Sequence, residues 1–437
     1  MSEELLLSIE KLVYGGDGLA HASGNTVFVP YVLPGEGVRA TVKSKKKSLL
    51  WTELLEVTSP AASRIKAPCP HFGVCGGCHY QHIPATEQLR LKTEILRETL
   101  ARLAKINWDG PIQEHSAEPY GYRNRAQWAV RDAMPRALGY FLPESSFIIP
   151  VDVCPILSPL LAKTFDQLQN ITRAGHLPEG VQEIEAFADS SDQKIALNVA
   201  FDNFPKAAAQ LVSSFREVLP QLDSLLLLDQ SKDRFELSGP GFLFHDVGGY
   251  RFRVSHLSFF QVNRFLIEDL LQTMTAGAKG DMALDLYSGV GFFTLPLART
   301  FNRVVSVDLN LAATRDLYAN AEAAGVTVTS HNESAEEFLR KTEEKPDFVS
   351  IDPPRSGLGA AASARLLELG APEIAYLSCD PSTLARDLAV LTGTSKKGGS
   401  GEPPAASNRY EIVEMHLFDL FPQTFHIETL ARLRRVA

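Results

Sequence analysis

The chain has 437 residues, of which 45% are hydrophobic and 22% charged, a balance typical of a globular protein with two or three domains. It contains no run of about 18 apolar residues and no basic-then-apolar N-terminus, so we expect a cytoplasmic protein without membrane contact. The net charge of −9 excludes a generally basic nucleic-acid coat but allows local basic patches. The candidates are Lys43, Lys45, Lys46 and Lys47, and Arg123, Arg125, Arg131 and Arg136.

Short strands separated by glycine turns are predicted for the first part of the chain. The expected strands are residues 5–12, 26–30, 37–43 and 50–57. This spacing favours a small, OB-like β-barrel over residues 1–59. A barrel with a lysine-bearing loop would suit RNA binding, although β-barrels also serve many other functions.

The chain contains five cysteines, and this odd number favours metal binding or nucleophilic chemistry over a disulfide framework. The first three lie in a segment without periodicity, residues 60–83, which suits a loop folded around an inorganic centre. Together with the fourth they could hold an iron–sulfur cluster or zinc, and spacing does not decide between the two. These four are Cys69, Cys75, Cys78 and Cys154.

The elements predicted after residue 83 change near residue 280, from a helix and a mixed region to strands that alternate with helices. Residues 84–105 predict a helix, and residues 120–255 a mixed region with strands at 194–201 and 224–228. The core-facing stripe of that helix would be Leu89, Leu96, Leu100 and Leu103. Further on, strands alternate with helices, which predicts a Rossmann-like parallel sheet. The strands are residues 282–287, 303–308, 326–329, 348–352 and 374–378, and residues 394–408 are a low-complexity hairpin tip.

A glycine loop at residues 288–291 follows the first of these strands and opens a helix. Gly289 would let the backbone approach a ligand, whereas Thr294 stands where a dinucleotide fold would need its third glycine. Asp308 ends the next strand, where an acid suits the two hydroxyls of a ribose. A nucleoside ligand without phosphate is therefore favoured, and S-adenosylmethionine is one.

Cys379 ends another strand of this sheet, at the same edge as Gly289, Asp308 and Asp352. A lone cysteine is more often packing than nucleophile, but this position favours chemistry. One reaction that needs such a cysteine is methylation of uracil, because carbon 5 of the base is too weak a nucleophile to attack a methyl sulfonium directly. A thiolate that adds to carbon 6 would activate carbon 5 for this attack. A base must then remove the carbon-5 proton. Glu428 is the candidate and His426 its rival.

Six motifs in a fixed order give the chain a family resemblance. They are Cys69-x5-Cys75-Gly-Gly-Cys78 with a distant Cys154-Pro155, Phe259-Phe260-Gln261-Val262-Asn263, Asp285-Leu-Tyr287-Ser-Gly289-Val-Gly291, Asp352-Pro-Pro-Arg355, Ser378-Cys379-Asp380-Pro381, and Phe421-Pro-Gln-Thr-x-His426-x-Glu428-Thr429. With these motifs the chain resembles the RNA uracil-5 methyltransferases over nearly its whole length. Among them it is most similar to the bacterial 23S ribosomal RNA enzymes that carry a TRAM domain and an iron–sulfur cluster.

The resemblance implies roles for particular residues. Cys379 would be the nucleophile and Glu428 the general base. The S-adenosylmethionine contacts, with Gly289, would be Gln261, Tyr287, Asp308 and Asp352. The ligands of a [4Fe–4S] cluster would be Cys69, Cys75, Cys78 and Cys154. Phe292 and Ser334 depart from the residues that relatives often carry at those positions.

The resemblance also implies a domain order and a substrate. Residues 1–59 would be a TRAM-like barrel, 60–240 a central α+β domain with the cluster, and 241–437 the methyltransferase domain. In relatives the helix that corresponds to residues 84–105 packs on the catalytic domain. The partner would be RNA, with 23S ribosomal RNA favoured over transfer RNA, and we expect a monomer.

Three other functions fit parts of the sequence. The first is the same reaction on transfer RNA, because both groups of enzymes share the chemistry. The second is cytosine-5 methylation, which also uses cysteine attack at carbon 6. Those enzymes usually carry a cysteine in or beside the motif that here reads Asp352-Pro-Pro-Arg355, and the absence of a cysteine from this motif favours uracil. The third is an iron–sulfur RNA-binding protein with a decayed catalytic domain, against which the intact Cys379 and Glu428 argue.

Overall fold

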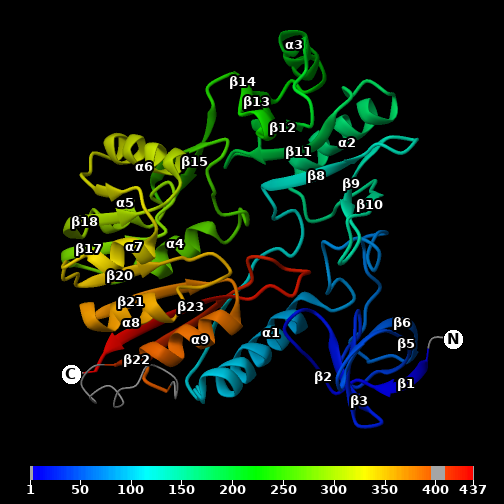
Figure 1. Ribbon diagram of the computed structural model, residues 1–437, viewed down its shortest axis with the longest axis horizontal. Helices are drawn as coiled ribbons and strands as arrows, with labels where there is room; N and C mark the ends of the chain where they lie inside the picture. The colour runs from blue at the N-terminus through cyan, green and yellow to red at the C-terminus, as the bar shows by residue number, and fades with distance from the viewer. Residues whose placement is uncertain (1–2, 395–408, 437) are drawn as a thin grey trace. The chain divides into compact units, whose positions relative to one another are not determined.

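A computed structural model describes residues 3–394 and 409–436 of the chain (Figure 1). The chain divides into two compact units. The first comprises Met1–Leu96, Gly139–Pro155 and Phe421–His426, and the second Arg97–Leu138, Ile156–Leu420 and Ile427–Ala437. The predicted hairpin tip at 394–408 lies, apart from Thr394, outside the described residues. No helix of the described residues is long and apolar enough to span a membrane.

The first unit begins with a six-stranded sheet in the order β1-β5-β6-β4-β3-β2. Its strands are β1 (Glu4–Ser8), β2 (Lys11–Leu12), β3 (Gly18–Ala22), β4 (Asn25–Val29), β5 (Gly37–Lys46) and β6 (Leu49–Ser59). Alternate side chains such as Leu7, Val27, Val38 and Ala40 form its buried core. The predicted strand at 5–12 is wrong as a single strand, because the chain changes partner from β5 to β3 between β1 and β2.

The cysteine-rich segment after β6 has no helix or strand, as predicted, and α1 (Ala85–Thr99) follows it. The last turn of this helix, Leu100–Ala104, is π-helical. The prediction that Leu103 faces the core is wrong, since its side chain is 47% exposed while Ala104 is buried. The wider turn displaces the side-chain register by one residue, and sequence periodicity does not reveal it.

The second unit contains a sheet with the strand order β8-β11-β12-β13-β14, packed with helices α2 (Pro159–Arg173) and α3 (Ala208–Val218). The strands are β8 (Arg125–Arg131), β11 (Val181–Ala188), β12 (Ile195–Phe201), β13 (Leu222–Asp229) and β14 (Arg234–Ser238). The strands predicted at 194–201 and 224–228 are confirmed as β12 and β13. The second unit also contains the hairpin of β15 (Phe242–Val247) and β16 (Tyr250–Ser255). Strand β9 (Ala137–Phe141) pairs with β10 (Ile148–Pro150), and this pair belongs to the first unit from Gly139 onward.

The second unit also contains an eight-stranded sheet in the order β19-β18-β17-β20-β21-β23-β22-β7. Its parallel part is β17 (Gly280–Leu286), β18 (Phe301–Val307), β19 (Thr329–His331), β20 (Phe348–Ile351) and β21 (Glu373–Ser378). This confirms the predicted Rossmann-like sheet. The prediction for 326–328 is wrong, because the Val326 N–H still caps the preceding helix through the carbonyl of Ala321.

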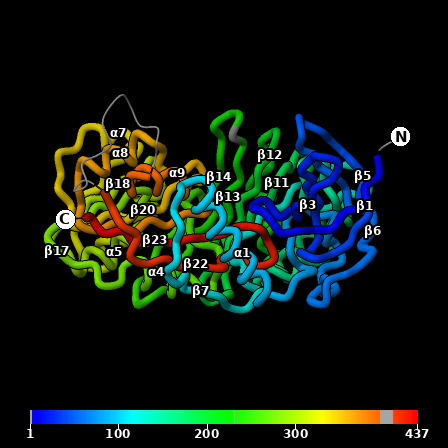
Figure 2. Tube along the Cα trace, turned by 90° about the horizontal axis from the view of Figure 1, so that it is seen from below, coloured from blue at the N-terminus to red at the C-terminus, as the bar shows by residue number. Residues whose placement is uncertain are grey.

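Helices cover both faces of this sheet; Figure 2 shows α7–α9 on one side and α4 and α5 on the other. The helices are α4 (Ile267–Thr275), α5 (Thr294–Leu297), α6 (Leu311–Ala324), α7 (Ala335–Lys341), α8 (Ala360–Leu369) and α9 (Pro381–Leu391). Strands β22 (Tyr410–Phe418) and β23 (Glu428–Arg435) form an antiparallel pair beside β21, and β7 (Gln113–His115) joins the edge. Because β23 runs against β21, its first residue lies near the last residue of β21.

Candidate functional site

The glycine loop between β17 and α5 has the backbone of a ligand cradle. Gly289 and Gly291 adopt φ of +53° and +90°, a region that favours glycine. A Cβ on Gly291 would lie 3.2 Å from the side chain of Leu317, whereas a Cβ on Gly289 would meet no atom within 4 Å. The loop therefore packs on α6 at Gly291 and leaves space beside Gly289, which fits a bound nucleoside.

Asp308 follows β18 and is held against this loop. One carboxylate oxygen accepts a hydrogen bond from the Gly289 N–H at 2.8 Å, and the other from the Asn310 N–H at 2.7 Å. Asn310 in turn caps α6 by accepting from the N–H groups of Ala312 and Ala313. The structure thus joins two predicted cofactor residues, Gly289 and Asp308, in one hydrogen-bonded unit.

Asp285, on β17, is buried behind the loop. It accepts a 2.5 Å hydrogen bond from the Thr294 hydroxyl, so the residue that replaces a third glycine anchors the start of α5. Burial raises the pKa of Asp285 to about 6, and the nearby charge of Asp308 adds to the rise, while hydrogen bonds from Thr294 and Ser350 oppose it. The sequence analysis assigned no role to Asp285 or Thr294.

Asp352 follows β20 and meets the loop that carries Gln261. The Gln261 amide donates to its carboxylate at 3.5 Å. Burial raises the pKa of Asp352 to about 7, with a further contribution from the charge of Asp285. The Tyr287 hydroxyl donates to Glu336 at 3.4 Å. The pKa of this hydroxyl is raised, mainly by burial and to a lesser degree by the Glu336 carboxylate. Gln261 and Asp352 are therefore brought together, whereas the Tyr287 hydroxyl is directed to Glu336.

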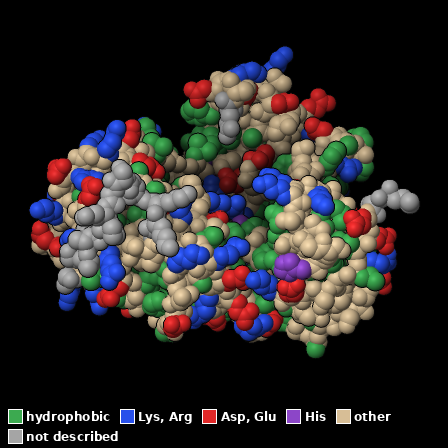
Figure 3. Space-filling model, turned by 60° about the horizontal axis from the view of Figure 1, so that its bottom comes forward, with side chains coloured by type: hydrophobic (Ala, Val, Ile, Leu, Met, Phe, Trp, Pro, Cys, Tyr) green, Lys and Arg blue, Asp and Glu red, His purple; other side chains and the backbone are tan. Residues whose placement is uncertain are grey.

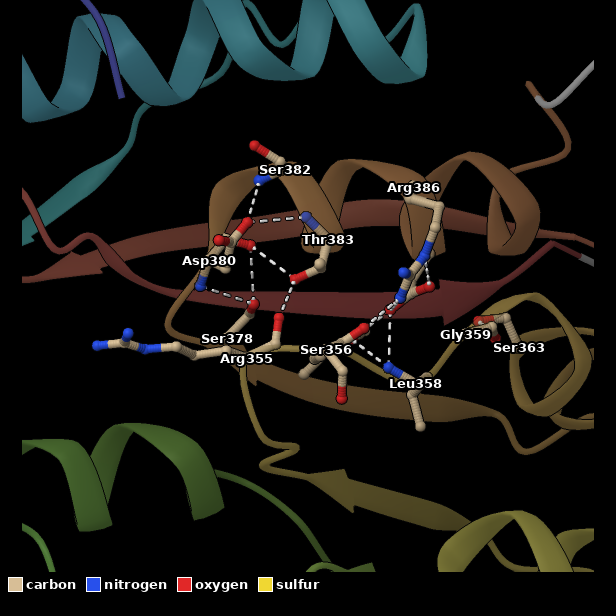
Figure 4. A network of polar contacts seen from close by, with 12 residues as sticks. Arg355, Ser356, Leu358, Gly359, Ser363, Ser378, Asp380, Ser382, Thr383 and Arg386 are labelled. Carbon is tan, nitrogen blue, oxygen red and sulfur yellow. Dashed lines mark hydrogen bonds and ion pairs between the residues drawn. The ribbon is translucent and has the colours of Figure 1, made fainter. Parts of the chain in front are cut away.

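Cys379 follows β21 at the same edge of the sheet, and its backbone is fixed by the residue after it. Asp380 caps α9 by accepting from the N–H groups of Ser382 and Thr383 (Figure 4). Burial raises the pKa of the Cys379 thiol to about 12, the charges of Glu428 and Asp352 add to the rise, and Arg355 opposes it. The thiol is therefore neutral in the free protein at neutral pH.

Glu428 is the first residue of β23 and lies beside this thiol. Ser378 of β21 pairs with Thr429, so one residue further along the ladder Cys379 lies opposite Glu428. Glu428 is only 6% exposed, and its pKa is raised well above that of a free glutamate. Burial is the main cause, and the charge of Asp352 adds to it. Cys379, Glu428 and Asp352 thus form one acidic cluster at the strand ends.

His426, the rival base, belongs to the first unit, as does the rest of the segment 421–426. Its ring contacts those of Phe421 and Phe425, with centroid distances of 5.5 and 4.5 Å. The backbone carbonyl of Gln423 accepts from the N–H groups of His79 and Tyr80. The His426 ring therefore packs against two aromatic rings of its own unit.

The four cysteines proposed as metal ligands all belong to the first unit and are free and partly buried. Burial raises the pKa of the Cys78 thiol to about 12, and the charges of Cys154, Cys75 and Cys69 add to the rise while a hydrogen bond with Gln81 opposes it. Within residues 3–394 and 409–436, however, no group of three or more potential ligands is arranged to hold a metal ion. Four free cysteines in one unit are the donor type of a thiolate-ligated centre, and their described positions are not those of coordinating ligands.

Several residues that the sequence analysis missed fix the loop that carries Gln261. Asp316 of α6 accepts from the Ser255 N–H and hydroxyl and from the Ser258 hydroxyl, at 2.7–2.8 Å. Asn263 donates to the carbonyls of Asp419 and Leu420 just after β22. Asn263 could have been found from its place in the Phe259–Asn263 motif, whereas nothing in the sequence singles out Asp316.

Comparison with known proteins gives consistent matches. The profile of the family described as tRNA (Uracil-5-)-methyltransferase matches residues 246–436. An uncharacterized RNA methyltransferase of Aquifex aeolicus is 33% identical over 98% of each chain. Relatives named 23S rRNA (uracil(1939)-C(5))-methyltransferase RlmD are 30% identical in Alkalilimnicola ehrlichii, over 100% of this chain and 97% of that one, and 32% identical in Halomonas elongata, over 98% and 89%.

A solved structure shows the same fold. The tRNA (uracil-54, C5)-methyltransferase of Pyrococcus abyssi, in complex with S-adenosyl-L-homocysteine, superposes with a TM-score of 0.74. The match covers 98% of this chain and 100% of that one, at 23% identity. It extends the likeness beyond the part of the chain that the family profile covers.

Proposed function

Because the chain belongs to the tRNA (uracil-5-)-methyltransferase family and is an S-adenosylmethionine-dependent RNA methyltransferase, we propose that it methylates carbon 5 of one uridine in 23S ribosomal RNA. The observation that carries this proposal is the meeting of Cys379 and Glu428 at the strand ends. The relatives of known name that match over nearly the whole chain favour ribosomal RNA. The same reaction on transfer RNA is the second candidate, since the Pyrococcus abyssi enzyme acts there.

S-adenosylmethionine would supply an electrophilic methyl group on a sulfonium. In the proposed site Asp308 accepts hydrogen bonds from the ribose hydroxyls, and the open space beside Gly289 receives the nucleoside. Gln261, Tyr287 and Asp352 complete the cofactor contacts. The residues present fit this group, because each carboxylate oxygen of Asp308 retains a lone pair beyond its backbone hydrogen bond.

In the proposed reaction the Cys379 thiol releases its proton to solvent and the thiolate adds to carbon 6 of the uracil. The new S–C6 bond makes carbon 5 an enolate carbon, which would take the methyl group as its bond to the sulfonium sulfur breaks, leaving a neutral thioether. The Glu428 carboxylate then removes the carbon-5 proton, the S–C6 bond breaks, and 5-methyluridine leaves. Because burial raises the pKa of both groups, each must lose a proton before it acts.

The N-terminal parts of the chain would serve RNA binding and stability. We propose that residues 1–59 form a TRAM-like barrel and 60–240 a central domain, with 241–437 as the methyltransferase domain. A [4Fe–4S] cluster would be held by Cys69, Cys75, Cys78 and Cys154. The four cysteines are free, partly buried and members of one unit, which supports it. The cluster would be structural, because Cys379 and Glu428 account for the chemistry.

The test is analysis of the modified nucleoside. Purified protein is incubated with S-adenosylmethionine and with unmodified 23S ribosomal or transfer RNA, and digested nucleosides are identified by mass spectrometry. We expect 5-methyluridine in the ribosomal RNA and none with Cys379→Ala. A product that is 5-methylcytidine, or an active Cys379→Ala variant, would refute the proposed reaction.

A further inference from the structure

A pocket of about 300 Å³ lies in the second unit, between β8 and the segment that leads to Gln261. Its lining combines cationic, amide and aromatic side chains, and the residues that the argument uses are Arg123, Arg125, Gln127, Glu185, Phe259 and Val262. Val262 adjoins Gln261, whose amide reaches Asp352. The pocket is therefore lined by the residue that follows a proposed cofactor contact. Its volume is at the lower end of the roughly 300–1,000 Å³ found for small-ligand sites.

The floor of the pocket is a rigid ion pair. The Arg125 guanidinium donates to both carboxylate oxygens of Glu185, at 2.7 and 3.1 Å, and to the carbonyls of Ser258 and His256. The Asn198 amide donates to the same carboxylate at 2.7 Å. Arg125 thus commits four of its five N–H donors to the protein, which favours a structural role for it over an RNA contact.

The rim of the pocket carries a cation that is available. The Nε of Arg123 donates to the carbonyl of Arg125 at 2.8 Å, and within residues 3–394 and 409–436 its guanidinium has no carboxylate partner. Phe259 is 62% exposed and Gln127 is also exposed. Figure 3 shows Lys and Arg mixed with Asp and Glu over one face of the molecule. RNA binding there would therefore depend on individual available cations such as Arg123 and not on a general positive charge.

We propose that this pocket binds a second unstacked nucleotide of the RNA, next to the target uridine. The inference rests on the proposed function and adds a substrate subsite to it. Arg123 would pair with a phosphate, Phe259 would stack on the base, and the Gln127 amide would contact the base edge. These are the groups by which proteins hold single-stranded RNA. The Arg125–Glu185 pair would keep the pocket in shape before RNA arrives.

The first experiment measures binding of a fluorescein-labelled oligouridine nonamer to the full chain by anisotropy over a salt series. Arg123→Ala should weaken binding by about tenfold and flatten the plot of log K against log salt by about 0.7, the contribution of one phosphate contact in a single strand. Arg123→Lys should keep the wild-type slope. Phe259→Ala should weaken binding by roughly 5- to 150-fold, as loss of one stacked base does, with an unchanged slope.

Two further variants keep the result interpretable. Arg251→Ala removes an exposed arginine of β16 outside the pocket and should bind as the wild type does. Gln127→Ala alters an exposed side chain without disturbing the fold and should reduce the preference for oligouridine over oligoadenosine. An unchanged salt slope in a folded Arg123→Ala variant, or an equal loss in Arg251→Ala, would overturn the proposal.

Methylation assays separate this inference from the proposed function. If the wild type forms 5-methyluridine while Arg123→Ala keeps its KM and oligonucleotide affinity, the pocket is rejected and the function stands. If the wild type forms none while oligonucleotide binding still depends on Arg123 and Phe259, the function is rejected and the pocket stands as an RNA site.

Discussion

Substitution of Asp308 tests how the cofactor is held. In the free protein the carboxylate already accepts the N–H groups of Gly289 and Asn310, at 2.8 and 2.7 Å. If it also accepts two ribose hydroxyls, Asp308→Ala loses charge-assisted hydrogen bonds of roughly 1.5–3 kcal/mol each. We expect S-adenosylmethionine affinity to fall at least about tenfold by calorimetry, together with a lower melting temperature of the free protein.

A thermodynamic cycle separates ribose binding from loop anchoring. S-adenosylhomocysteine and its analogue without ribose hydroxyls are titrated into the wild type and into Asp308→Asn, which keeps one acceptor oxygen. We expect the wild type to prefer the natural ligand by at least about tenfold, and the variant to lose most of this preference, because contacting groups couple. Equal preferences in the two proteins would show that Asp308 only anchors Gly289 and Asn310.

Three further predictions concern charge and metal. Because the pKa of Asp285 is raised to about 6 in the folded protein, ionisation of this buried carboxyl destabilises the fold. The free energy of unfolding of the wild type, measured in urea, should therefore fall by roughly 3 kcal/mol relative to Asp285→Asn as the pH rises from 4 to 6, and then level off. A difference between the two proteins that does not change with pH would contradict this. Because the pKa values of Cys379 and Glu428 are raised, kcat should increase with pH from 6 to 9, and a rate that falls over this range would exclude ionisation of either group as the limiting step. Protein purified without oxygen should be brown with about four irons, and Cys78→Ser should lose the colour; one zinc and no iron would refute the cluster.

The site residues that follow the parallel strands of the sheet could be predicted from the sequence. Asp308, Asp352 and Cys379 each follow an apolar run, and parallel strands end at one edge of a sheet. Their convergence follows from topology alone. Glu428 could not be placed in this way, because it begins a strand that runs against β21, and only the ladder pairing Ser378 with Thr429 brings it to Cys379.

Other features depend on tertiary contacts that leave little trace in the sequence. The π-helical turn at Leu100–Ala104 moves Leu103 into solvent, against its helical spacing. The sequence analysis grouped the arginines of residues 123–136 as one candidate basic patch. In the structure, however, Arg136 donates to the carbonyls of Leu177 and Pro178, and Arg125 is bound to Glu185. Only contacts between distant segments show which arginine remains available.

The central claim is that Cys379 attacks carbon 6 and Glu428 removes the carbon-5 proton, and one variant tests it most directly. Glu428→Gln is incubated with RNA and S-adenosylmethionine and run on a denaturing gel, with Cys379→Ala and His426→Ala alongside. Loss of a general base typically slows a step by about 10²–10⁴-fold, so Glu428→Gln should transfer the methyl group, fail to eliminate, and accumulate a slow-migrating covalent complex. Cys379→Ala should form no complex. Normal turnover by Glu428→Gln, with the complex appearing in His426→Ala instead, would contradict the account.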